Sequence, residues 1–265
     1  MTAPIARPVG PLLRQWRERR RLSQLELSLR AEVSTRHLSF VETGRSRPTS
    51  EMILRLTEWL DVPLRDRNAL LLAGGYAPAY PEHELDDAEL APVRAALGHL
   101  LAGHEPYPAL VVDRRWQLLE ANRAVGLLTA GVAADLLRPP VNVLRLALHP
   151  EGMAARVINL GTWRAHLLER LDRQSRATAD PELAELLAEL RGYPGGGDGP
   201  RPGPADIVVP LRLRAGDEEL DLLSTTTVFG TPRDVTLAEL AIESFFPAGP
   251  ATAAALRRLA ASQSP

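Results

Sequence analysis

Residues 23–48 read SQLELSLRAEVSTRHLSFVETGRSRP, and this stretch decides the fold of the N-terminal part of the chain. Ser23, with Glu26 three positions later, has the form of a capping box, which begins a helix that we expect to run to about residue 31. After a tight turn at 32–33, Ser34 caps a second helix. That helix should end at 43–44, because Gly44 tolerates the left-handed conformation that follows a helix.

Three further helices are expected to flank this pair. Leu13 and Trp16 lie on one face of the first, while Ile53, Leu56 and Leu60 repeat at helical spacing after residue 48. We expect the five helices to close into an all-α bundle within residues 1–75. The predicted helices cover about 10–21, 23–31, 34–43, 50–60 and 64–73.

The helix that begins at Ser34 has two distinct faces. At about 100° per residue, Leu38 and Val41 face one direction, and Arg36 lies opposite them with Phe40 and residue 39. A guanidinium fork can bond both acceptors of guanine in the major groove, so Arg36 is the best candidate for reading a base. Phe40 is apolar, although the rest of this face is polar. We expect it to touch a thymine methyl, with packing on the neighbouring domain as the alternative. The candidate DNA contacts are Gln24, Ser34, Thr35, Arg36, His37, Ser39, Phe40, Arg45 and Arg47, of which the first and the last two are expected on phosphates.

Charge is divided unevenly along the chain. Residues 1–70 hold 13 arginines against 8 acidic residues, a net charge of +5, whereas residues 71–265 hold 18 against 25, a net charge of −7. A basic N-terminal part indicates a polyanion partner for that part alone. The chain has no cysteine and no apolar run near 18 residues, so we expect a cytoplasmic, nucleoid-associated protein without disulfides or membrane insertion.

These N-terminal features resemble the helix-turn-helix of the XRE family, which includes the phage repressors. The resemblance rests on Gln24, the small residue at 28 or 31, the core pair at 38 and 41, and the closing Glu42-x-Gly44 before Pro48. It implies binding to a double-stranded DNA operator. One such module reads a short half-site, so we expect a homodimer on an inverted repeat with half-sites about one helical turn apart.

The rest of the chain mixes helical and strand patterns. The Gly, Pro and acidic residues of 75–90 predict a linker, which leads into a helix at 88–101 and makes 76–104 a connecting segment. Glycines and prolines over 192–204 predict a flexible loop. Residues 105–265 should form an α+β domain with helices packed on one face of its sheet. The expected elements are a hairpin of 108–112 and 116–119, helices within 122–178 and at 181–191, and strands at 206–214, 219–229 and 237–246.

Five strings in this part resemble the ligand-binding domain of MmyB-like regulators, a PAS-like fold that follows an XRE-type head in many actinobacterial proteins. The resemblance implies a sheet that cups an apolar pocket closed by helices, with a small hydrophobic, fatty-acid-like molecule as the effector. The strings are PALVVDRRWQLLEAN (108–122), NVLRLALHPEG (142–152), VINLGTWRAHLLERL (157–171), STTTVFGTPRDVTLAELAIESFFP (224–247) and the helix at 252–257.

Polar or amphipathic residues within these apolar patterns are the candidates for ligand contacts. Each also has a structural interpretation. Trp163 on a helix is more often core, His149 beside a proline is more often a satisfied structural group, and Asn122 after a strand commonly caps the next helix. The candidates are Asn122, Arg145, His149, Asn159, Trp163 and His166.

Two other interpretations of this domain stay open. In one, it binds no effector and only dimerises. In the other, it is an enzyme that uses the hydroxyls of 224–227 with His166 as a base, yet no G-x-S-x-G elbow, metal-spaced histidine pair or phosphate loop occurs. We therefore expect no enzymatic activity, no catalytic residue, no metal and no bound cofactor.

Overall fold

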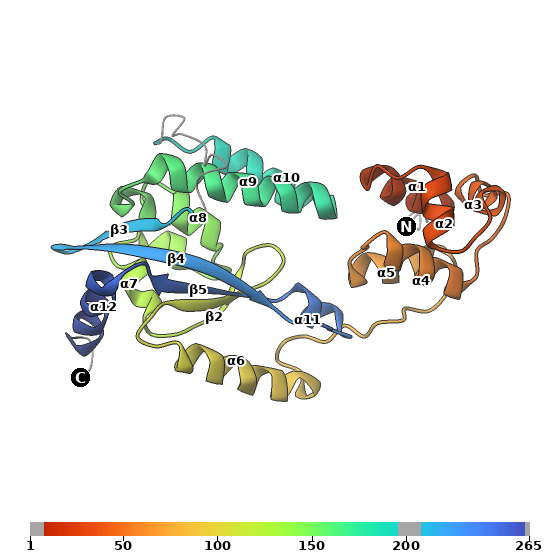
Figure 1. Cartoon of the computed structure of the whole chain (residues 1–265). Helices are drawn as coiled ribbons and strands as arrows, with labels where there is room; N and C mark the ends of the chain where they lie inside the picture. Colours follow the sequence, from red (N-terminus) through yellow and green to blue (C-terminus); the bar gives the residue numbers. More distant parts are fainter. Residues whose placement is uncertain (1–7, 196–207, 263–265) are drawn as a thin grey trace. The chain divides into compact units, whose positions relative to one another are not determined.

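The computed structural model describes residues 8–195 and 208–262 (Figure 1). Its contacts divide the chain into two compact units. Unit 1 holds the residues up to 83 together with 231–238, and unit 2 holds 84–230 and the residues from 239 onward. Most of the predicted flexible loop at 192–204 lies outside the described residues, as do the first two residues of the predicted strand at 206–214.

Unit 1 contains the five predicted helices within residues 8–83, and their caps have the predicted chemistry. The Ser23 hydroxyl accepts from the Glu26 amide at 3.1 Å, while the Glu26 carboxylate accepts from the Ser23 amide at 2.7 Å. Ser34 accepts from the His37 amide at 3.1 Å, and Gly44 has φ +74°. The helices are α1 (Val9–Arg19), α2 (Gln24–Arg30), α3 (Thr35–Glu42), α4 (Ser50–Trp59) and α5 (Leu64–Ala73).

A single apolar core holds these helices together. Leu13, Leu38, Ile53 and Leu56 are each at most 1% exposed. Gly10 allows α1 to lie directly against α3, because a Cβ at this position would sit 2.1 Å from the carbonyl oxygen of Val41. The rear face of α3 is thus fixed both by apolar packing and by close backbone approach.

Unit 2 is an α+β domain, as predicted. Within its described residues it holds a five-stranded antiparallel sheet in the order β2-β1-β5-β4-β3. The elements, with η marking 3-10 helices, are η1 (Ala88–Leu90), α6 (Ala91–Gly103), β1 (Ala109–Val112), β2 (Leu118–Ala121), α7 (Val125–Thr129), η2 (Ala134–Leu137), α8 (Val143–Leu148), η3 (Met153–Arg156), α9 (Leu160–Thr178), α10 (Pro181–Arg191), β3 (Leu211–Ala215), β4 (Glu218–Val228), β5 (Ala241–Pro247) and α12 (Pro250–Ser262).

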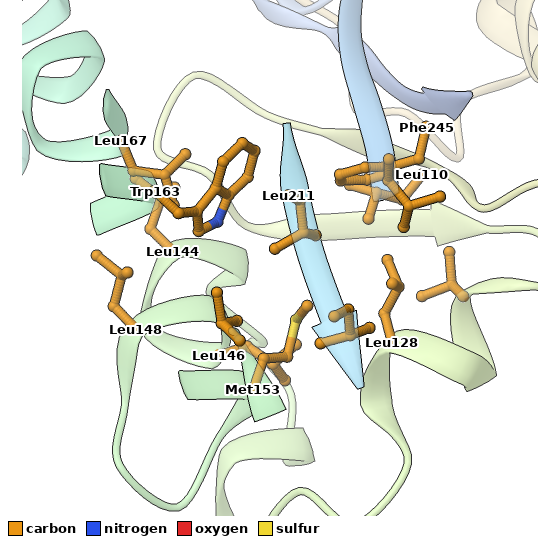
Figure 2. Packing of buried hydrophobic residues seen from close by; sticks show 14 of the residues in the cluster. Leu110, Leu128, Leu144, Leu146, Leu148, Met153, Trp163, Leu167, Leu211 and Phe245 are labelled. Carbon is orange, nitrogen blue, oxygen red and sulfur yellow. The ribbon is translucent and has the colours of Figure 1, made fainter. Parts of the chain in front are cut away.

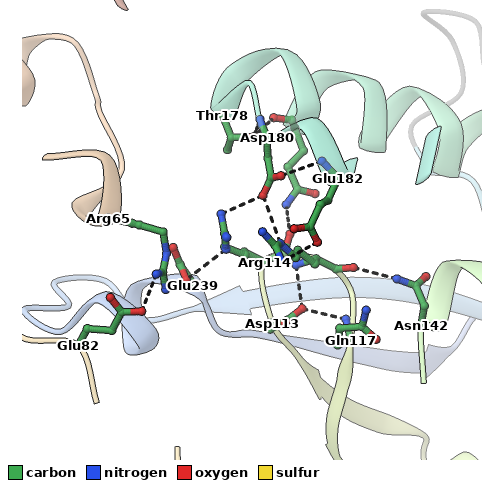
Figure 3. Close-up of polar contacts among 12 residues, drawn as sticks. Arg65, Glu82, Asp113, Arg114, Gln117, Asn142, Thr178, Asp180, Glu182 and Glu239 are labelled. Carbon is green, nitrogen blue, oxygen red and sulfur yellow. Dashed lines mark hydrogen bonds and ion pairs between the residues drawn. The ribbon is translucent and has the colours of Figure 1, made fainter. Parts of the chain in front are cut away.

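The predicted hairpin of β1 and β2 is confirmed, but its second strand begins later than residue 116. Asp113 accepts from the backbone amides of Arg115 and Gln117, each at 2.8 Å, which extends the turn (Figure 3). Trp116 lies within that turn at φ +65°. Asp180, which caps α10, accepts from Arg114 at 2.9 Å and so fixes the turn in unit 2. The local Asp-based turn therefore overrides the apolar pattern at Trp116.

The predicted strand at 237–246 was wrong at its start. A short helix, α11 (Val235–Glu239), occupies 235–239, and β5 begins at Ala241. Asp234 explains the difference, because its carboxylate accepts from the Leu237 amide at 3.0 Å and caps the helix. The predicted strand at 206–214 corresponds to β3, which begins at Leu211. The strand begins only there because the preceding Pro210 has no amide to donate to a sheet.

The main core of unit 2 lies against one face of the sheet. Figure 2 shows side chains of α8 and α9 meeting Leu211 of β3 and Phe245 of β5. The alternate residues of β1, Ala109 and Val111, are buried as well, and α6 packs against this strand. Helices therefore cover both faces of the sheet at β1, whereas helices on one face were expected.

Candidate functional site

The candidate recognition surface of unit 1 is the outer side of α3. Leu38 is 0% exposed and Val41 is 1% exposed, so both anchor the helix from behind. Arg36 and His37 are exposed on the other side. The two faces of the helix are therefore separated as its sequence predicts, and a guanidinium lies on the side open to solvent.

Phe40 lies between two arginines on this surface. The guanidinium carbon of Arg36 is 5.4 Å from the centre of its ring, and that of Arg45 is 5.9 Å away. An aromatic face attracts such cations and leaves their edge N–H groups available as donors. The half-buried ring thus holds two positive charges on one surface, which suits an anionic partner with hydrogen-bond acceptors.

A buried ion pair supports α3 from inside. Arg17 of α1 donates from Nε and Nη2 to the two carboxylate oxygens of Glu42, at 2.7 and 2.8 Å. The Gln24 side-chain amide donates to the same carboxylate at 2.8 Å. These bonds with Glu42 raise the pKa of Arg17 above its ordinary value. Sequence reasoning placed Glu42 in the motif but missed Arg17, because the pair is 25 positions apart.

Three other candidate residues make contacts inside unit 1. Thr35 shares a hydrogen bond of 2.8 Å with the Ser28 hydroxyl, which ties α3 to α2. Arg47 donates to the carbonyl of Gly74 at 2.8 Å, and Ser34 caps α3. The structure therefore brings Arg36, His37 and Arg45 together at the surface with the half-buried Ser39 and Phe40, while Gln24, Ser34, Thr35 and Arg47 brace the motif.

The linker after α5 is bonded to unit 1. Asn68 of α5 donates to the carbonyl of Tyr80 at 2.7 Å and accepts from the amides of Ala79 and Tyr80. Arg65 forms an ion pair with Glu82 at 2.5 Å (Figure 3). These contacts fix the path of the chain as it leaves the helical bundle.

The segment 231–238, which joins β4 to β5, bonds the same linker within unit 1. The Val235 amide donates to the carbonyl of Pro81 at 2.9 Å, and the Thr236 hydroxyl donates to the carbonyl of His83 at 2.6 Å. The His83 ring nitrogen Nδ1 lies 2.8 Å from the carboxylate of Asp234. Both ends of this segment continue into strands of unit 2, so the linker is tied to the β4–β5 connection.

Unit 2 encloses an apolar cavity of about 80 Å³. Its wall comes from the sheet and from the helices α7, α8 and α9, and most of its residues are leucine, valine or aromatic. Sites for drug-sized ligands usually begin near 300 Å³, so a ligand with a long tail would have to displace side chains here. Representative wall residues are Leu110, Trp116, Leu128, Met153, Trp163 and Phe245.

Polar groups line the cavity from α7, α9, β4 and β5. Arg170 donates to both carboxylate oxygens of Glu243, at 2.6 and 3.0 Å, and its guanidinium lies 4.5 Å from the centre of the Trp116 ring. Ser224 also lines the cavity. Arg170 and Glu243 were missed from the sequence, and Ser224 was considered there only among the hydroxyls of the enzymatic interpretation. The spacing of Trp163, Leu167 and Arg170 on α9 contained a signal, but the strand residues depended on register.

Trp163 is the one candidate ligand residue of the six that lines this cavity in the described part of the chain. His166 stacks on Trp163 with ring centres 5.6 Å apart. Burial, reinforced by the charges of Arg170 and Arg173, lowers the pKa of His166.

The other four candidates do not line this cavity, and each makes hydrogen bonds within unit 2. Asn122 accepts from the Ala109 amide and donates to the carbonyls of Leu101 and Tyr107. These bonds join the β1–β2 hairpin to α6. Asn159 bonds the backbone of β3 and of the residue before it. Arg145 pairs with Glu189, and His149 accepts from the Glu151 amide.

Across residues 8–195 and 208–262, no group of three or more His, Cys, Asp and Glu residues is arranged to hold a metal ion. No helix in the same ranges has the length and apolarity needed to cross a bilayer.

Comparisons with known proteins agree with the two-unit structure. A family model described as the MmyB-like transcription regulator ligand binding domain matches residues 93–259, and a helix-turn-helix model matches residues 13–66. Both resemblances seen in the sequence are thereby confirmed. No curated protein matches the chain. One solved structure, described as an RNA-binding Light-Oxygen-Voltage receptor, matches at 13% identity over 97% of this chain and 64% of its own length, with a TM-score of 0.26.

Proposed function

This chain belongs to the family of regulators with an MmyB-like ligand-binding domain, and from that premise we propose that it reads an inverted-repeat operator through α3 under the control of a small hydrophobic effector. It is a DNA-binding transcription regulator with a ligand-binding domain. The observation that carries the proposal is the division of α3, with Leu38 and Val41 buried and Arg36 exposed beside Phe40 and Arg45.

Arg36 is assigned the base-reading role in this proposal. Its guanidinium can donate two parallel hydrogen bonds to a guanine edge, while Arg45 and His37 suit the phosphates on either side. A single short helix reads few base pairs, so useful selectivity requires two copies on a two-fold symmetric operator. The regulator is therefore proposed to act as a homodimer.

The cavity of unit 2 is the proposed effector site. Its wall is apolar, and a hydrophobic, acyl-chain-like molecule would gain by leaving water there. β4 and β5 contribute Ser224, Glu243 and Phe245 to that wall. Because the 231–238 connection between these strands bonds the linker at Pro81 and His83, movement of the strands would reach the linker. The effector acts on DNA binding to the extent that it prefers one arrangement of this connection.

The base-reading role is tested by selecting operator sequences from random duplex DNA and measuring the affinities of purified variants by fluorescence anisotropy. Arg36→Ala should reduce the ratio of selected to scrambled affinity by about tenfold or more, since one bidentate contact gives about 1–3 kcal/mol of discrimination. Weak, salt-sensitive binding should persist. Arg55→Ala, which removes a partly exposed arginine of α4, is the matched control. An unchanged ratio in Arg36→Ala would remove α3 from the reading role.

A second candidate is a regulator whose unit 2 dimerises without binding an effector. The small cavity of about 80 Å³ favours this alternative. Native mass spectrometry of the purified protein distinguishes the two. A stoichiometric small molecule supports the effector site, whereas a dimer whose DNA affinity resists every hydrophobic probe supports dimerisation alone.

A further inference from the structure

The polar groups of the unit 2 cavity already balance one another in charge. Arg170 and Glu243 both line the cavity and are joined by two hydrogen bonds, from Nη2 to Oε1 and from Nη1 to Oε2. Glu243 Oε1 also accepts from the Thr226 hydroxyl at 3.0 Å. The side chain of Glu243 is 6% exposed. Among its described lining residues, the cavity therefore presents a neutral pair and no spare cation.

Ser224 lies on the same face of the sheet as this pair. The register of β4 and β5 pairs Ser224 with Phe245 and Thr226 with Glu243, so alternation directs all four side chains to the cavity side. Ser224 lines the cavity, and among the described residues its hydroxyl has no hydrogen-bond partner. A serine hydroxyl can both donate and accept. The other hydroxyl in the wall, that of Thr129, donates to carbonyls of its own helix α7. Ser224 is thus the hydroxyl with both functions open to a ligand, which can engage it without disturbing the ion pair.

We propose that the effector carries an uncharged polar head group, an alcohol or a primary amide, on an apolar tail, with Ser224 binding the head beside the Arg170–Glu243 pair. The inference rests on the proposed effector site and specifies its ligand class. A carboxylate head group would be repelled by the negative charge of Glu243. To bind it, Arg170 would have to leave Glu243, and a buried carboxylate without its partner is strongly unfavourable. An ammonium head group would likewise be repelled by the positive charge of Arg170.

Three probes with the same eight-carbon chain separate these head groups: 1-octanol, octanamide and octanoate. Isothermal titration of the full-length protein near neutral pH should give clear binding of the two neutral probes and at least about tenfold weaker binding of octanoate. Octanoate is also the least hydrophobic of the three, so the decisive measurement is the change in this ratio on substitution.

Glu243→Gln provides that measurement. It keeps the size of the side chain and its bonding with Thr226 but leaves Arg170 without a carboxylate. The ratio of octanol to octanoate affinity should fall by at least about tenfold, because the site now holds an unpaired cation. Glu151→Gln, at an exposed glutamate of unit 2, should leave the ratio unchanged. Ser224→Ala should weaken 1-octanol and octanamide several-fold while leaving thermal unfolding near the wild-type midpoint.

Three results would overturn the inference. Tighter binding of octanoate than of 1-octanol by the wild-type protein would show that the site selects an anion, and the proposed effector site would still stand. A ratio that Glu243→Gln does not change would show that this pair does not read the head group. If none of the three probes binds while operator binding persists, both this inference and the effector role of the cavity fail.

Discussion

Each unit contains an arginine–glutamate pair with a buried carboxylate, and the two pairs differ in what surrounds them. In unit 1, the side chains of Arg17 and Glu42 are 9% and 1% exposed and lie within the packed helical core. In unit 2, those of Arg170 and Glu243 are 25% and 6% exposed and line a cavity. The same chemistry therefore fixes a surface in one unit and faces a cavity in the other.

The comparison indicates how the two units divide their tasks. Unit 1 keeps α3 in one position through Arg17, Glu42 and Gln24, so the arginines on its outer side are presented in a constant arrangement. Unit 2 leaves its pair beside open space, where a bound molecule can change the neighbouring strands. A rigid reader joined to an adaptable sensor is the arrangement that ligand-controlled DNA binding needs.

The largest effect is expected at Glu42. Glu42→Ala leaves Arg17 buried without its partner, and breaking such a pair costs about 3–5 kcal/mol. The free energy of unfolding of unit 1 should fall by that order, and operator binding should be lost. Hydrogen exchange followed by mass spectrometry measures the loss in α1 and α3. Glu58→Ala, at an exposed position of α4, is the control, and equal protection in the two variants would contradict the bracing role.

Glu243→Ala should have a smaller effect, confined to unit 2. Arg170 is a quarter exposed and still packs on Trp116, so water compensates part of the lost pairing. We expect a loss of about 1–3 kcal/mol in the unfolding free energy of unit 2, as for a hydrogen-bonded charge. Denaturant unfolding with exchange protection in β4 and β5 checks this. A loss as large as that of Glu42→Ala would erase the distinction between the two pairs.

The connection between the units is tested at His83. His83→Ala removes the bond to Asp234 but leaves α3 and the cavity unchanged. We expect near wild-type affinity for the operator and for 1-octanol, with at least half of the effect of 1-octanol on DNA binding lost. Anisotropy titrations with and without 1-octanol measure both. His99→Ala, at an exposed position of α6, is the control, and a full effector response in His83→Ala would rule out this route.

The smallest effect is a dependence of unit 2 stability on pH through His166. Burial lowers the folded-state pKa of His166 below its unfolded value of 6.5, so the unfolded chain binds the proton more readily. Stability is therefore intact above pH 6.5 and falls as the pH drops from there toward the folded-state pKa. Thermal midpoints at about pH 7.5 and about pH 5.5 should differ less in His166→Gln than in the wild type. If the thermal midpoints of the two proteins changed equally with pH, a group other than His166 would be responsible for the pH dependence.

The sequence predicted unit 1 more closely than unit 2, for a physical reason. Caps such as Ser23 with Glu26, and the glycine stop at Gly44, act within a few residues, so a local pattern contains them. The cavity depends on pairings such as Thr226 with Glu243, which are set by the register of separate strands. Polar residues in apolar helices therefore suggested Asn122 and Asn159, whose amides turned out to satisfy backbone groups.

Local chemistry also explains the errors within unit 2. Asp113 and Asp234 each accept from backbone amides a few residues further along the chain. The predicted strand start at Trp116 is therefore part of a turn, and the predicted strand start at 237 is part of the helix α11. An aspartate before an apolar run contained this signal, but the apolar alternation outweighed it in the interpretation.

The most direct test of the account is the effect of a bound neutral probe on operator affinity. Fluorescence anisotropy should be recorded for the wild-type protein and its selected operator, with and without saturating 1-octanol. A rigid reader coupled to an adaptable sensor predicts that the dissociation constant changes by about fivefold or more. Superimposable curves, measured while titration calorimetry shows 1-octanol bound, would contradict it.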